Sequence, residues 1–192
     1  MRQLFRIQEF LARIVLGVGK ISAWLSIPLM VVIIFDVVTR RFFVLGSTKL
    51  QEAEWHLHAV LFLLCIGFCY IEDAHVRIDL LRERLSTRAR DWVEFLGCII
   101  FVIPYCLIVT YFAEEFVERS WAVGEASDSA TGLPYRWAIK AGLPIGLFVL
   151  LLSGITVLLR KIIELFGPAD LRELIPRKEE RTIEQIDRIG PN

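Results

Sequence analysis

Three histidines and four cysteines are the residues of this sequence that could serve a haem or a metal ion. His56 and His58 are two residues apart, so on a helix their side chains would point about 200° away from each other. His75 lies beyond the apolar run that holds them, and a bis-histidine haem site needs a histidine on a second helix. Cys65 and Cys69 share a helical face, but two ligands do not complete a zinc site. We therefore expect no cofactor and no metal site, and we interpret the cysteines as packing residues.

The motifs of nucleotide-driven or self-contained transport are missing from the sequence. It contains no Gly-x-x-x-x-Gly-Lys-Ser/Thr loop for binding a nucleotide phosphate. Secondary transporters place polar groups and broken helices at mid-membrane. The central positions of the apolar segments here are mostly Leu, Val, Ile and Phe, although Pro28 and Pro104 are expected to bend helices. We predict a chain that is not an enzyme and has no transport site of its own.

Charged side chains lie near the ends of the apolar segments instead. Asp36 and Arg40 are four residues apart, so they share a helical face and can form an ion pair. Glu115 and Arg119 have the same spacing, which predicts that a helix continues past the third apolar segment.

His75 and Asp79 could also share a helical face, where the carboxylate would fix the imidazole tautomer. With no nucleophile or third ligand nearby in the sequence, a structural role for this pair is favoured over catalysis or metal binding.

Glycines and small polar residues over 124–134 predict a true loop, and Pro134 suits the first turn of the helix that follows. This loop could contact a soluble partner or be a plain connector. The polar residues at the segment ends could likewise form a solvated ring or a contact with a partner subunit. The candidates for partner contact or structural roles are Asp36, Arg40, Arg41, Glu52, Glu54, His75, Asp79, Arg119, Glu125 and Ser127.

Four apolar segments must position these residues. The chain has 192 residues, of which 55% are hydrophobic, and a helix of about 20 apolar residues crosses a bilayer. A helix in a soluble bundle would show a polar stripe, and residues 143–159 show none. We predict an all-α integral membrane protein with spans at about 20–39, 55–72, 92–113 and 138–160. These spans form a transmembrane domain over 20–165, between an N-terminal segment over 1–19 and a short charged tail over 166–192.

The basic residues are shared unequally among the segments between these spans. Residues 2–20, 77–90 and 160–188 hold 16 of the 22 lysines and arginines, whereas residues 40–49 and 119–140 hold 6. The positive-inside rule therefore places both termini and the middle connection in the cytoplasm. The first apolar stretch is too long for the core of a cleaved signal and lacks a clear small-x-small site, so we interpret it as a retained anchor. A formal net charge of zero argues against a nucleic-acid partner.

The order of several short motifs resembles the small membrane subunit of tripartite ATP-independent periplasmic (TRAP) transporters. The most specific is the run Ala74-His75-Val76-Arg77-Ile78-Asp79-Leu80-Leu81 after the second span. The others are Arg40-Arg41-Phe42, Glu52-Ala53-Glu54-Trp55, Gly67, Gly124-Glu125-Ala126-Ser127, Gly132-Leu133-Pro134 and Leu143-Pro144-Ile145-Gly146. The resemblance covers residues 32–161, and the first twenty residues and the charged tail have no counterpart in it.

This resemblance implies a subunit of a bacterial inner-membrane transporter. Its partners would be a large multi-span permease subunit, which carries the substrate and sodium sites, and a periplasmic binding protein, which delivers an organic acid. The chain would brace the large subunit among membrane lipids. The alternative, suggested by the histidines, is a membrane anchor or electron-transfer subunit of a respiratory oxidoreductase.

Overall fold

A computed structural model describes residues 1–43, 46–75 and 84–174, and every described element is helical. The helices are α1 (Arg2–Ala23), α2 (Ser26–Phe42), α3 (Thr48–Ile71), α5 (Thr87–Gly97), the π-helix η1 (Cys98–Val102), α6 (Ile103–Ala122), α7 (Arg136–Phe166) and α8 (Ala169–Glu173). Four stretches are long and apolar enough to cross a membrane: Arg2–Phe42, Thr48–Ile71, Thr87–Ala122 and Arg136–Phe166. The predicted fold class, an all-α protein with four membrane-spanning segments, is therefore confirmed.

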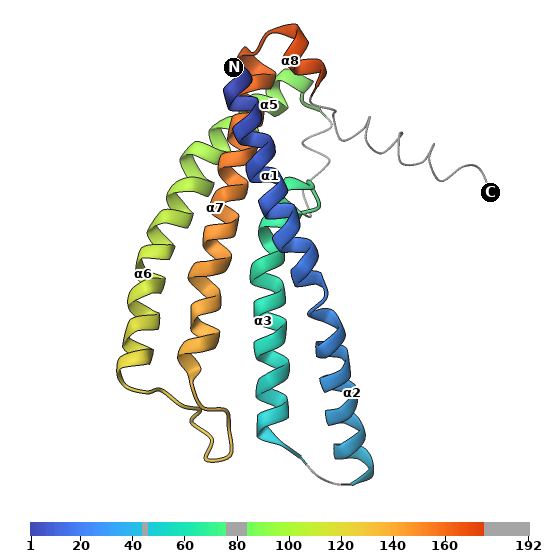
Figure 1. The fold of residues 1–192 in the computed structure, drawn as a ribbon, viewed down its shortest axis with the longest axis vertical. Helices are drawn as coiled ribbons and strands as arrows, with labels where there is room; N and C mark the ends of the chain where they lie inside the picture. Colours follow the sequence, from blue (N-terminus) through green and yellow to red (C-terminus); the bar gives the residue numbers. More distant parts are fainter. Residues whose placement is uncertain (44–45, 76–83, 175–192) are drawn as a thin grey trace, which may run out of the picture.

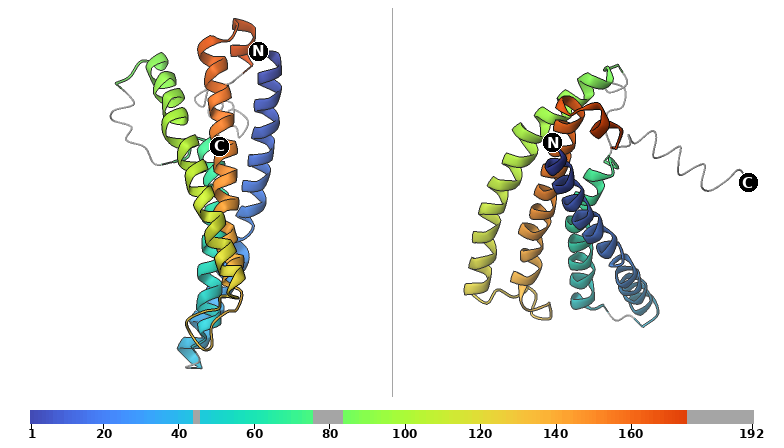
Figure 2. Two further views of the ribbon diagram at one scale, coloured as in Figure 1. Left: turned by 90° about the vertical axis from the view of Figure 1, so that its left-hand side faces the viewer. Right: turned by 45° about the horizontal axis from the view of Figure 1, so that its top comes forward.

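Helices α6, α7, α3 and α2 lie side by side in one layer, and α1 packs across it (Figure 1). The order across the layer is α6, α7, α3 and α2, and α1 crosses α3 and α7. Figure 2 shows that the half of the molecule with the α2–α3 and α6–α7 connections is thin when viewed from the side. We call this half the loop end, and the opposite end, with Met1, α5 and α8, the α8 end.

Close contacts at small residues hold α7 against α3. A Cβ atom added to Gly146 would lie 2.7 Å from Leu63 Cβ and 2.8 Å from the Leu63 carbonyl oxygen. A Cβ added to Gly67 of α3 would lie 2.9 Å from the carbonyl oxygen of Val149. Small residues allow helix backbones to approach closely in a membrane, where apolar contact alone does not drive helices together.

Both prolines that were expected to bend helices lie at irregular turns. Pro28 has no N–H, so the Trp24 carbonyl cannot receive its i+4 hydrogen bond. The Trp24 carbonyl instead accepts from Ile27 N–H at 3.1 Å, and the chain turns between α1 and α2. Pro104 follows the π-helix η1, in which the Ile103 N–H reaches back five residues to the Cys98 carbonyl. A π-turn of this kind accommodates a residue that cannot donate.

Two boundaries differ from the sequence prediction. Helix α1 runs from Arg2 to Ala23 without a break at residue 20, and the first nineteen residues are part of the packed structure. The partly buried side chains of Leu4 and Phe5 pack against buried Ile163. Helix α7 begins at Arg136, so Pro134 precedes it, and Tyr135 before the helix has a left-handed φ of 63°. The charged tail begins with the short helix α8, and the tail beyond residue 174 lies outside the described residues.

Candidate functional site

Two carboxylates on the first turns of α3 point in different directions at the loop end. Ser47 caps the N-terminus of α3, because its Oγ accepts a hydrogen bond of 3.4 Å from the Leu50 N–H. Glu52 and Glu54 then follow two residues apart, which separates them by about 200° around the helix. Glu52 contacts the α6–α7 loop, whereas Glu54 lines a pocket beside α2.

Glu52 is the acceptor around which the α6–α7 loop folds. Its side chain is buried and accepts a 2.6 Å hydrogen bond from the Leu133 N–H, and its other oxygen accepts from the Ser127 hydroxyl. The Arg136 guanidinium lies 4.0 Å from the same carboxylate. Gly132 has no space for a side chain, since a Cβ there would lie 2.2 Å from Ser127 Oγ. We call Glu52, Ser127, Leu133 and Arg136 the Glu52 hub.

The same loop is attached to α6 and α7 through Glu125. The Lys140 ammonium donates to the Glu125 carboxylate and also lies 3.9 Å above the ring of Phe116. The hydrogen bond from Lys140 lowers the pKa of the Glu125 carboxyl, because it stabilises the ionised form. Trp121 and Trp137 meet edge to face, with ring centroids 4.5 Å apart. The loop is therefore an ordered structure that joins three helices, rather than a loose connector.

A pocket lies between α2 and α3 at the loop end. It has a volume of about 400 Å³ and is lined by Asp36, Val37, Arg40, Arg41, Gln51, Glu54 and Trp55. We call it the α2–α3 pocket. Asp36 and Arg40 pair as predicted, through Asp36 Oδ2, and Asp36 is only 2% exposed. Four of the residues singled out in the sequence, Asp36, Arg40, Arg41 and Glu54, therefore meet in one place.

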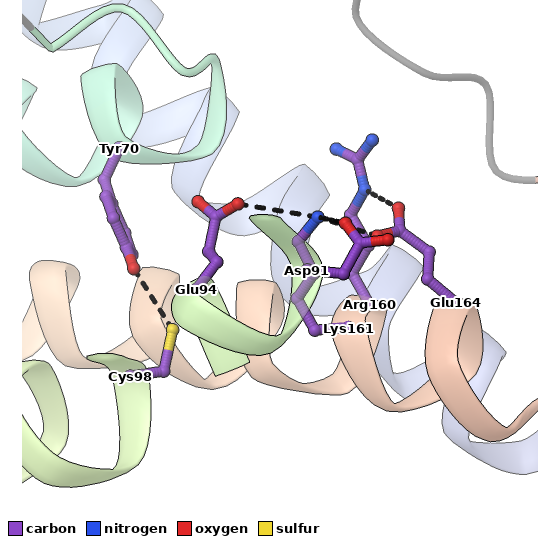
Figure 3. A network of polar contacts seen from close by, with 7 residues as sticks. All are labelled: Tyr70, Asp91, Glu94, Cys98, Arg160, Lys161 and Glu164. Atoms are coloured by element: carbon purple, nitrogen blue, oxygen red, sulfur yellow. Dashed lines mark hydrogen bonds and ion pairs between the residues drawn. The ribbon is translucent and has the colours of Figure 1, made fainter. Parts of the chain in front are cut away.

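A second ionic group lies toward the α8 end (Figure 3). The Lys161 ammonium on α7 contacts Asp91 and Glu164 at 2.7 Å each and Glu94 at 3.4 Å. Arg160 donates to Glu164 at 2.9 Å. We call these five residues the Lys161 cluster. Figure 3 also shows Tyr70 of α3 in contact with Cys98 of η1, with 3.1 Å between the hydroxyl oxygen and the sulfur. Polar contacts therefore connect α3, α5, η1 and α7 near this end.

The remaining candidates have local roles or fall outside the described residues. Arg119 pairs with Glu115 as predicted, on an exposed part of α6. His75 follows the end of α3, where Asp73 has a positive φ of 56°, and its Nε2 lies 3.4 Å from the Ile66 carbonyl. Asp79, its proposed helical neighbour, lies outside the described residues. In the described part of the chain, no group of three His, Cys, Asp or Glu side chains is arranged to hold a metal ion.

Sequence reasoning missed Arg136, Lys140 and Lys161 as parts of these groups. Arg136 and Lys140 are at the start of α7, where only the folded loop reveals their acidic partners. Lys161 is seventy residues from Asp91, so no helical spacing connects the two. The available signal was Glu164 three residues after Lys161, a spacing that brings side chains together on a helix.

Comparison with known proteins gives one family. The sequence model described as "Tripartite ATP-independent periplasmic transporters, DctQ component" matches residues 29–164. This range includes α2 from its fourth residue onward, α3, α5, η1, α6 and almost all of α7. No curated protein and no solved structure gave a significant match. The family match gives no support to the oxidoreductase alternative.

Proposed function

The chain belongs to the family of DctQ components of TRAP transporters, and we propose that it braces the large membrane subunit of such a transporter. As the small permease component, it would work beside the large subunit and a periplasmic binding protein. We further propose that this transporter takes up an organic acid with sodium ions. The large subunit would then couple the movement of sodium ions to that of the organic acid.

The observation that supports a bracing role is the one-layer arrangement of helices with ionic groups at both ends. The Glu52 hub joins the α6–α7 loop to α3, and the Lys161 cluster joins α5 to α7. Between them, α3 and α7 approach so closely at Gly67 and Gly146 that neither glycine has space for a methyl group. Packed interiors resist deformation, so such a layer is suited to stay still while another part of a complex moves.

The layer also leaves much apolar surface for lipid and for a partner within the membrane. On α2, large side chains such as Met30, Ile34 and Phe35 are more than half exposed. On α6 at the other edge, Tyr111 and Phe112 are at least 60% exposed. A monomeric soluble protein rarely exposes contiguous apolar surface on this scale. These edges therefore favour contact with lipid tails and with a multi-span subunit.

The charge distribution favours an orientation with both termini in the cytoplasm. In this orientation the loop end, with the Glu52 hub and the α2–α3 pocket, is on the periplasmic side of the bacterial inner membrane. The Lys161 cluster is then on the cytoplasmic side. We retain Glu125 and Ser127 as candidates for contact with the partner proteins at the loop end.

Co-purification tests the proposed function. The tagged chain is extracted from its native membrane in a mild detergent, and a large multi-span protein is expected to accompany it in a fixed ratio. Cells that lack the chain should not take up the substrate. Expression of the chain should restore uptake, but only when the binding protein is also present. Purification of the chain alone, or of a complex with a haem absorption band, would contradict the proposal.

A further inference from the structure

The α2–α3 pocket contains acceptors that no described residue satisfies. Asp36 Oδ1 and Glu54 Oε1 are buried, and neither has a hydrogen-bond donor among the residues that the structure describes. Both side chains line the pocket, whose volume is about 400 Å³. A buried carboxylate oxygen without a donor is costly, so native structures pair such groups with a side chain, a solvent molecule or a ligand. The two oxygens therefore indicate a ligand with N–H or O–H donors, and the negative charge favours a cation.

The pocket also presents a positive charge that no carboxylate in the described part of the chain pairs. Arg40 is engaged with Asp36 Oδ2. Arg41, the next residue, lines the same pocket and makes no ion pair within the described parts of the chain. The positive charges of the two arginines balance the negative charges of Asp36 and Glu54. A ligand that carries one cation and one anion, and therefore no net charge, matches this pocket. Arginine is also the side chain best shaped to hold a phosphate through two N–H groups.

The position of the pocket indicates that such a ligand comes from the membrane. The lining residues belong to the last turns of α2 and the first turns of α3, where α2 ends and α3 begins. Trp55 lines the pocket and is 61% exposed, and tryptophan gathers at the level of lipid headgroups. Exposed apolar residues of α2, including Phe35 and Val38, would lie alongside acyl chains.

We propose that the α2–α3 pocket binds the headgroup of a phospholipid that carries a primary ammonium and a phosphate, as in phosphatidylethanolamine. The ammonium donates to Asp36 Oδ1 and Glu54 Oε1. The phosphate accepts from Arg41 and from the N–H groups of Arg40 that do not contact Asp36. A phosphatidylcholine headgroup has no N–H donor, so it leaves both oxygens unsatisfied. A phosphatidylglycerol headgroup has no cation for the two carboxylates. A basic side chain from a partner protein would satisfy the carboxylates but would add a third positive charge and leave Arg41 without an anion.

Native mass spectrometry of the full chain tests this assignment. The delipidated protein is titrated with phosphatidylethanolamine, phosphatidylcholine and phosphatidylglycerol of identical acyl chains. We expect phosphatidylethanolamine to bind about tenfold more tightly than phosphatidylcholine, the scale of one charge-assisted hydrogen bond. Glu54→Gln should remove most of this preference, and Arg41→Gln should weaken binding of all phospholipids. Glu115→Gln is the control, because Glu115 lies in an exposed pair on α6.

Carbodiimide coupling provides a second measurement on the whole transporter complex. The reagent activates a carboxyl group, an adjacent primary amine attacks it, and an amide forms while the reagent leaves as its urea, so Asp36 or Glu54 should gain the mass of phosphatidylethanolamine less one water. Equal binding of the three lipids, or a preference that survives both Glu54→Gln and Asp36→Asn, would overturn the proposal. Cross-linking of Glu54 to a lysine of the large subunit would assign the pocket to a protein contact. Competition by water-soluble glycerophosphoethanolamine at the same concentration would assign it to a free metabolite. The proposal does not depend on the bracing role, since the lipid preference is measured on the isolated chain.

Discussion

Replacing Gly146 with alanine should separate α3 from α7 and weaken the whole layer. The added methyl carbon would lie 2.7 Å from Leu63 Cβ, 2.8 Å from the Leu63 carbonyl oxygen and 3.0 Å from its carbonyl carbon. Carbon atoms in contact normally lie about 3.5–4.0 Å apart, so the helices must move by up to about 1 Å. Two of the three obstructing atoms are backbone, which cannot change rotamer to make room.

Forcing extra volume into a packed interface of this kind costs about 1–3 kcal/mol. For a chain of this length, each kcal/mol lowers Tm by about 2–4 °C. We therefore expect Gly146→Ala to lower the Tm in detergent by roughly 2–12 °C, measured by the fluorescence of a dye that reacts with newly exposed cysteines.

Gly17→Ala is the matched control for this experiment. Gly17 also lies within a helix, but a Cβ atom there would meet no atom within 4 Å. Alanine stabilises a helix relative to glycine by about 0.5–1 kcal/mol, so this variant should keep or raise the Tm. The reasoning about α3–α7 contact is refuted if both variants shift the Tm equally, or if Gly146→Ala is the more stable of the two.

Three further changes test the polar groups. Lys161→Met should cost about 1–3 kcal/mol, because it leaves the half-buried Asp91 carboxylate without the ammonium that contacts it, whereas Arg119→Met at an exposed pair should cost less than about 1 kcal/mol; similar losses of Tm would argue against a special role for the Lys161 cluster. Glu52→Ala should speed proteolytic cleavage within residues 123–135, since the loop loses its buried acceptor, and an unchanged cleavage rate would mean that other contacts hold the loop. The pKa of Glu125 is lowered, so its pairing with Lys140 stabilises the folded chain at neutral pH. This stabilisation is lost as the pH falls from the ordinary pKa of a carboxyl group through the lowered pKa. The Tm should therefore fall less on acidification in Glu125→Gln than in the parent, and parallel curves would exclude this carboxyl as the cause.

The sequence was most informative where physics acts locally or along a whole helix. Apolar length revealed four spans, because crossing a bilayer demands a continuous apolar run. Spacing revealed the pairs Asp36–Arg40 and Glu115–Arg119, because residues four apart meet on any helix.

Long-range contacts were beyond such reasoning. The meeting of Glu52 with Ser127 spans seventy-five residues and depends on how the α6–α7 loop folds back. The start of α1 at Arg2 was also missed, because the arginines of the first twenty residues suggested a separate segment. Those arginines lie on an amphipathic helix whose other side packs in part against the α8 end. Polar residues on one side of a helix are compatible with burial on the other.

The central place of α7 in the layer has a consequence for how the protein is made. Of the long helices that the structure describes, α7 is the last to leave the ribosome, yet it lies between α6 and α3 and also contacts α1 and α5. Helices α1, α2 and α3 can begin to associate during synthesis, because α1 and α2 each contact α3. Among the described residues, α6 packs chiefly on α7, so we expect α6 to join the layer only after α7 has been inserted. We therefore expect a chain interrupted before residue 136 to present quality-control proteases with an incomplete membrane domain.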